Sequence, residues 1–256
     1  GLKSDGYTGS MVDLWENGEW AGNNTKYFTG AQNVELDSYL PMILSHKVQG
    51  FLEEHVSRNT SEPFFMYFAS DLAHNPYISP YYYNDRCSEY AILNNNTDDD
   101  IFGIQEKCAM MLILDETIGN LTCKLESLGL ADNTLIAFAS DNGGDLVGDN
   151  YPYVGKKFYE LQGGFLTPAA VFGGALPDEV RGTKYDNLFH GTDWMPTLMH
   201  AATNGDWTGS MLGDSNKLSG VDQWNQIIGA ESDRPREYAL TYAVSYTHLT
   251  LPTKWL

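Results

Sequence analysis

Asp141 and Asn142, the first two residues of the segment Asp-Asn-Gly-Gly at 141–144, carry side chains that could bind a metal ion. Carboxylate and amide oxygens are the ligands that hard cations such as calcium prefer. The preceding residues 135–139 are apolar and β-prone, which is typical of a buried strand in a parallel sheet. Chemistry in open α/β sheets takes place just past the carboxyl ends of such strands. The same four residues are also typical of an ordinary turn, so the segment alone leaves both interpretations open.

Two other polar positions have a comparable setting. His74 follows the aromatic and apolar run 64–69, which predicts a second buried strand. Lys157 lies in the long loop 145–167. A histidine after a strand is usually structural or exposed, and the pair Lys156-Lys157 would ordinarily be solvated. By themselves these residues therefore assign no chemistry.

Helical and strand patterns alternate along the chain. Apolar residues recur every fourth position from Leu40 to Val56, with Asp37 and Ser38 as capping candidates, which predicts an amphipathic helix. Further helices are predicted at 102–128, 190–202 and 220–228, and a further strand at 168–172, with Asp193 as a capping residue. This order predicts an α/β fold with right-handed crossovers and a mainly parallel sheet.

Composition limits the function classes. The chain has 256 residues, 34 of them acidic and 15 basic, for a formal net charge of -19. Such a charge repels nucleic acid and anionic membrane surfaces, so we expect no nucleic-acid partner. An anionic substrate would need a cation or local Lys and His residues. No run approaches the roughly 18 apolar residues of a membrane span, so no transmembrane segment is expected.

The cysteines and glycosylation sequons indicate the cell compartment. Cys87 and Cys108 flank an Asn/Asp-rich segment and could close a loop, whereas Cys123 is predicted to be buried in a helix. With three cysteines, at least one lacks an internal partner. Four sequons favour a glycoprotein of the secretory pathway, and they begin at Asn23, Asn59, Asn95 and Asn120.

Several segments between residues 62 and 230 form an ordered set. They are Glu62-Pro-Phe-Phe-Met-Tyr-Phe-Ala69 before His74-Asn-Pro76, residues 129–144, Gly155-Lys-Lys157 with Gly163-Gly164, Thr192-Asp-Trp-Met-Pro-Thr-Leu198, and Leu218-Ser-Gly-Val-Asp222. In this order and spacing they resemble the sulfatase family, most closely its arylsulfatase B-like branch, within the alkaline-phosphatase-like superfamily. The resemblance implies a three-layer sandwich, in which helices flank a mainly parallel sheet.

The resemblance also implies site roles. Asp141 and Asn142 look like calcium ligands, and His74 and Lys157 are expected to contact the sulfate or the bridging ester oxygen. Calcium would neutralise the sulfate charge, and Lys or His could donate a proton to the leaving alcohol. In the family the nucleophile is a hydrated formylglycine, made from a cysteine in a Cys-x-Pro-Ser-Arg motif.

This chain departs from the family pattern by lacking segments of the family's N-terminal portion, which would precede Gly1, and at two positions within the loop 145–167. None of its cysteines is followed by x-Pro-Ser-Arg, and the family's early Asp-Asp pair and Gly-Lys-Trp-His-Leu-Gly segment are also absent. The chain has Tyr153-Val154 where the family has an Arg before Gly155, and Leu161-Gln where it has Trp-Glu. We therefore expect an inactive internal fragment that lacks the nucleophile.

The expected domains are a partial sulfatase catalytic domain at 1–230, the start of a C-terminal subdomain at 231–243, and a non-native tail at 244–256, which resembles translated sequencing-adapter sequence. The expected function of the full-length parent is calcium-dependent hydrolysis of sulfate monoesters on a small molecule or a glycan, with sulfated sugars favoured, in a lysosomal or extracellular location. One alternative is a non-catalytic calcium-binding relative. The other is a phosphatase or phosphodiesterase of the same superfamily, which six unclustered histidines disfavour.

Overall fold

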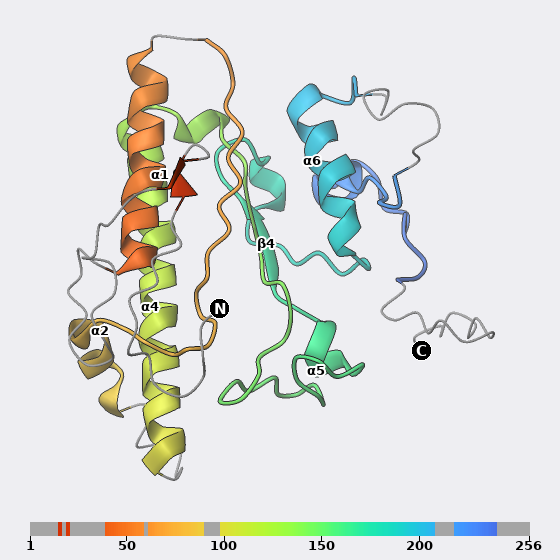
Figure 1. Cartoon of the computed structure of the whole chain (residues 1–256). Helices are drawn as coiled ribbons and strands as arrows, with labels where there is room; N and C mark the ends of the chain where they lie inside the picture. Colours follow the sequence, from red (N-terminus) through yellow and green to blue (C-terminus); the bar gives the residue numbers. More distant parts are fainter. Residues whose placement is uncertain are drawn as a thin grey trace. The chain divides into compact units, whose positions relative to one another are not determined.

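The chain divides into two units (Figure 1). The computed structural model describes residues 15–16, 19–20, 39–58, 61–89, 98–207 and 218–239. Unit 1 comprises residues 1–132 and 145–149, and unit 2 comprises residues 133–144 and 150–256. The predicted capping residues Asp37 and Ser38, three of the four sequons (Asn23, Asn59 and Asn95) and the tail 244–256 lie outside the described residues.

Unit 1 is built mainly from helices. Its elements are β1 (Trp15–Glu16), β2 (Glu19–Trp20), α1 (Leu40–Ser57), α2 (Tyr81–Arg86) and α4 (Asp98–Ser127). Both α1 and α2 pack against α4, and β1 pairs with β2 in an antiparallel ribbon. Pro41 lies in the first turn of α1, where its missing N–H has no helical partner to lose. Across the described part of the chain, none of the helices has both the length and the apolar character needed to cross a bilayer.

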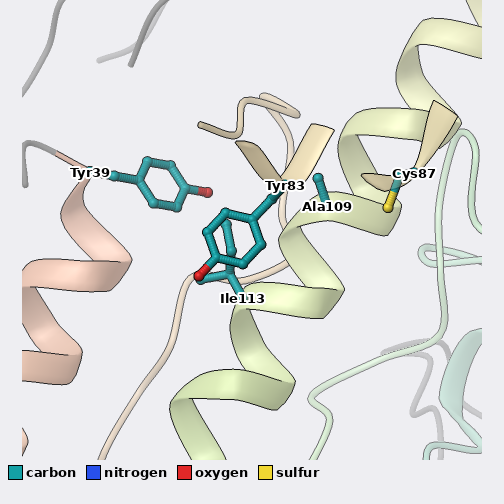
Figure 2. Packing of buried hydrophobic residues seen from close by; sticks show 5 residues of the cluster. All are labelled: Tyr39, Tyr83, Cys87, Ala109 and Ile113. Atoms are coloured by element: carbon teal, nitrogen blue, oxygen red, sulfur yellow. The ribbon is translucent and has the colours of Figure 1, made fainter. Parts of the chain in front are cut away.

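The core of unit 1 lies where α2, α4 and the start of α1 meet. Figure 2 shows five of its buried side chains, which are Tyr39, Tyr83, Cys87, Ala109 and Ile113. The two tyrosine hydroxyls keep hydrogen-bond partners, since Tyr39 donates to the Ile78 carbonyl at 2.8 Å and Tyr83 donates to Glu116 at 2.7 Å. Nearby, Glu106 is buried and accepts a hydrogen bond from Ser79 Oγ at 2.5 Å. Burial raises the pKa of the Glu106 carboxyl, and its hydrogen bonds oppose that shift only in part.

A disulfide between Cys87 and Cys108 joins the end of α2 to α4 and confirms the predicted loop closure. Its cysteines are 21 residues apart, so by the loop-entropy model it stabilises the fold by about 3 kcal/mol. The prediction for Cys123 is wrong: this thiol is exposed, because its position on α4 faces away from the packed side of the helix.

The sheet of unit 2 consists of β3 (Ile136–Ala139) and β4 (Ala169–Phe172). Both strands lie where the sequence predicts them, but they pair antiparallel, with Ile136 opposite Phe172 and Ala139 opposite Ala169. The pair of strands that the structure describes in unit 2 therefore does not show the mainly parallel sheet that the sequence predicts. The chain leaves β3 and returns through residues 140–168 to run back beside it. Alternate residues of β3 are exposed, so this strand is also less buried than predicted.

The predicted strand at 64–69 is also wrong. This segment has no strand assignment, and Phe65 and Tyr67 are exposed. A strand requires a hydrogen-bonded neighbour, and none of the described residues pairs with this segment. The aromatic run alone therefore did not determine strand formation.

The remainder of unit 2 is organised around a buried carboxylate. Its helical segments are α5 (Gln162–Phe165), η4 (Asp178–Val180), η5 (Gly191–Asp193), α6 (Trp194–Thr203) and α7 (Trp224–Ile227). Asp193 caps η5, as predicted, by accepting from the His190 backbone N–H at 2.9 Å. It is 0% exposed and also accepts from the Val221 N–H, from Gln223 Nε2 and from the guanidinium of Arg236. Burial acts to raise the pKa of Asp193, but the hydrogen bonds from Arg236 and the two backbone N–H groups outweigh it and lower that pKa.

Candidate metal and sulfate site

The turn that follows β3 carries the two predicted metal ligands. Asp141 is exposed, and its Oδ1 accepts a hydrogen bond from the Asn142 backbone N–H at 2.8 Å. Asn142 is half-buried and donates through Nδ2 to the Gly143 carbonyl at 2.9 Å. These local bonds are those of a turn, and they leave oxygen atoms of both side chains as acceptors. The turn interpretation and the ligand interpretation of this segment are therefore compatible.

Close backbone packing explains the glycines next to these ligands. A Cβ on Gly143 would lie 1.8 Å from the Gly163 carbonyl oxygen, and a Cβ on Gly163 would lie 2.3 Å from the Gly155 oxygen. The Gly143 N–H donates to the Gly164 carbonyl at 2.9 Å. Only residues without a side chain allow the three backbone segments to approach this closely.

The side chain of Asn150 joins the loop 145–167 to the turn that follows β3. Its Oδ1 accepts from the Gly144 N–H at 2.7 Å, and its Nδ2 donates to the carbonyls of Gly144 and Gly155, both at 3.0 Å. Asn150 was not predicted as a site residue, because a single asparagine in a loop gives no periodic or motif signal. The hydrogen bonds show that Asn150 positions both segments of the candidate site.

Lys157 belongs to the loop that Asn150 holds. Its backbone N–H donates to the Gly144 carbonyl at 3.1 Å, which places it beside the turn that carries Asp141 and Asn142. Its side chain is half-buried, and its Nζ lies 5.3 Å from the centroid of the Phe158 ring. The structure thus brings three of the four predicted site residues onto two connected segments of unit 2.

The fourth predicted residue, His74, lies in unit 1. It is exposed, its backbone N–H donates to the Asp71 carbonyl at 2.9 Å, and its Nδ1 lies 2.5 Å from the Asn75 carbonyl oxygen. A role for His74 together with Lys157 stays a prediction.

The donor atoms fit a part of a calcium site. Calcium takes about six to eight oxygen ligands, and Asp141 and Asn142 present oxygens of the kind it prefers. Within the described ranges, no group of three or more His, Cys, Asp or Glu residues is placed to hold a metal ion. The two side chains would therefore supply only some of the ligands.

The known proteins that this chain resembles are sulfatases. Mouse arylsulfatase J is 30% identical over 191 residues, which are 74% of this chain and 29% of that protein. The N-acetylgalactosamine-6-O-sulfatase of Bacteroides thetaiotaomicron is 30% identical over 156 residues, or 61% of this chain and 24% of that protein. Among solved structures, Ps i-CgsB in complex with k-i-k-neocarrahexaose aligns with a TM-score of 0.61 and 26% identity, over 75% of this chain and 39% of that one. These structural neighbours agree with an α/β fold of the alkaline-phosphatase-like type.

The chain spans about a third of the length of the curated relatives that it matches. The family model for the sulfatases matches residues 2–204, which is most of the chain and includes all four predicted site residues. This chain therefore belongs to the sulfatase family, a family of sulfuric ester hydrolases.

Proposed function

We propose that the full-length protein hydrolyses sulfate monoesters of sugars with the help of calcium. The observation that carries this proposal is the hydrogen-bonded junction of the Asp141–Asn142 turn with the loop that holds Lys157. Relatives named N-acetylgalactosamine-6-sulfatase and a neighbour solved in complex with k-i-k-neocarrahexaose support a sulfated glycan as the substrate.

In this proposal the side chains have separate tasks. Asp141 and Asn142 hold calcium through their oxygens, and the bound ion would supply positive charge against the sulfate oxygens. That local charge is needed, because the chain has a net charge of -19. Lys157 binds the sulfate or the bridging oxygen through its ammonium group, and His74 donates a proton to the leaving alcohol.

The nucleophile has to come from elsewhere in the full-length protein. No cysteine of this chain stands in a Cys-x-Pro-Ser-Arg motif, and the chain covers only a part of its relatives. We propose that the formylglycine cysteine and the remaining metal ligands lie upstream, so that this chain alone is inactive. The upstream part would also complete the three-layer sandwich around a mainly parallel sheet, with 1–230 in the catalytic domain, 231–243 in the next subdomain and 244–256 as a non-native tail.

A secretory location, lysosomal or extracellular, fits two features of unit 1. The disulfide between Cys87 and Cys108 forms stably in oxidising compartments. Asn120, which begins a sequon, is exposed on α4, where a glycan can be attached.

The test is hydrolysis of an aryl sulfate by the full-length protein, with the matching aryl phosphate as a comparison. Asp141→Ala should abolish sulfate release, and Lys157→Ala should lower turnover by about 100-fold or more, the scale for loss of one preorganised charge contact. Asp206→Ala and Lys184→Ala, which remove exposed charges elsewhere in unit 2, should leave the rate unchanged.

Full activity of Asp141→Ala would remove this residue from the site. A preference for the phosphate would favour the phosphatase alternative, and no hydrolysis of either ester would favour the non-catalytic one.

A further inference from the structure

The loop that carries Lys157 also exposes large aromatic side chains. Phe158 is 85% exposed, Tyr151 is 87% exposed, and Tyr159 is exposed as well. Aromatic rings are usually at least half-buried in folded proteins, because they lose favourable free energy when their surface stays in water. Several exposed rings on one anchored loop are typical of a surface that binds a ligand.

The backbone of Phe158 adds a second observation. Its φ is 73°, in the left-handed region that bulky residues rarely adopt. The chain passes from Lys157, which is bonded to Gly144, to Tyr159, whose N–H donates to the Lys156 carbonyl at 3.0 Å. The ring does not gain burial from this unfavourable conformation. Strained residues of this kind cluster at ligand sites, where the strain places a side chain for binding.

The position of the ring relative to Lys157 indicates what it could bind. The Lys157 Nζ lies 5.3 Å from the ring centroid, so the aromatic face and the ammonium group are neighbours. A sulfated sugar has a matching pair of features: a charged sulfate for the ammonium group, and the apolar C–H face of the sugar ring for the aromatic face.

We propose that Phe158 is a specificity-determining residue, which stacks against the sugar ring that carries the sulfate bound by Lys157. This inference rests on the proposed sulfatase activity and adds to it a contact for the sugar. Phe158 would favour sulfate esters of cyclic sugars over those of open-chain alcohols.

The experiment compares two substrates that share a leaving-group class. N-acetylgalactosamine 6-sulfate and ethyl sulfate are both sulfate esters of primary alcohols, but only the first has a sugar ring. In the full-length protein, Phe158→Ala should raise KM for the sugar sulfate by about 5- to 10-fold, the scale of one stacked aromatic contact, with little change in kcat. For ethyl sulfate, KM should not change.

Three variants separate the ring from the backbone. Phe158→Gly removes the ring and also relieves the left-handed strain, so it should raise the same KM as Phe158→Ala. Phe158→Tyr keeps the ring and should retain the KM of the unmodified protein. Tyr81→Ala, which removes an exposed ring from α2 in unit 1, should leave KM unchanged for both substrates.

Several results would overturn the inference. An equal KM rise for both substrates would mean that the ring acts only through Lys157. Unchanged KM values for both substrates would overturn the inference, and an accompanying loss of thermal stability would assign the ring to packing against another part of the protein. If the unmodified protein hydrolyses neither ester, the proposed function fails and this inference fails with it. If it hydrolyses both and the Phe158 variants match it, only this inference fails.

Discussion

Replacing Asn150 with alanine removes three hydrogen bonds that join the Asp141–Asn142 turn to the Lys157 loop. A hydrogen bond contributes about 0.5–1.5 kcal/mol to stability. The partner groups on Gly144 and Gly155 are half-buried, so water can replace part of the lost bonding. We therefore expect opening of this junction to become easier by about 2 kcal/mol, which is roughly a 30-fold increase in the open population.

Amide hydrogen exchange measures this opening directly. In Asn150→Ala, exchange at Gly144 and Lys157 should accelerate by roughly 30-fold, because the N–H of each residue is bonded within the junction. Asn225→Ala is the matched control, since it removes one exposed bond to Glu231 in the same unit. Asn150→Asp keeps the acceptor oxygen but loses both donated bonds, so amide exchange at Gly144 and Lys157 should also accelerate in this variant.

Equal exchange rates of the Gly144 and Lys157 amides in Asn150→Ala and in Asn225→Ala would refute this role of Asn150. Acceleration spread over the whole of unit 2 would also contradict it, because the three bonds of Asn150 are local.

Three further predictions concern stability. Replacing Cys87 and Cys108 together with alanine should lower the free energy of unfolding of unit 1 by about 3 kcal/mol in denaturant titration, and added reductant should then have no further effect. Asp193→Ala should cost about 3–5 kcal/mol because it leaves Arg236 without its buried partner, and the double alanine variant should cost no more than the single one. The lowered pKa of Asp193 makes its stabilisation of the fold present above pH about 3.9 and lost as pH falls through the folded-state pKa of Asp193. The raised pKa of Glu106 has the opposite effect, because unit 1 becomes more stable as pH falls through the folded-state pKa of Glu106. In thermal unfolding measured as a function of pH, Glu106→Gln should remove the Glu106 dependence, and its persistence would contradict the assignment to Glu106.

Periodicity predicted the long helices well. The spacing of apolar side chains located α1 and α4 to within a few residues of their observed ends, although the stripe predicted for α1 is buried only in part, with Leu52 buried and Val56 exposed. The strands β3 and β4 were also located correctly. Their antiparallel pairing was not, since an apolar run shows where a strand can form but not which neighbour it meets or in which direction. The strand predicted from the apolar run at 64–69 was wrong for the same reason.

The candidate site was predictable where a residue type identifies its own chemistry. Asp141 and Asn142 follow a strand and carry oxygens, so their turn was recognisable from the sequence. Asn150 was not, because its role depends on bringing Gly144 and Gly155 within reach of one amide group, which is a property of the folded chain. The exposure of Phe158 was also not predictable from the sequence, since an aromatic residue in a loop is expected to pack against other residues.

The glycine contacts at Gly143, Gly155 and Gly163 restrict how this site can evolve. A methyl group on Gly143 or Gly163 would collide with a backbone oxygen of the facing segment, and backbone cannot rotate away as a side chain can. The inner surface of the junction is therefore closed to single substitutions. The outward side chains of the same loop meet no such barrier. Substitutions of those side chains can change the outer surface of the loop while the inner glycines keep the two segments in register.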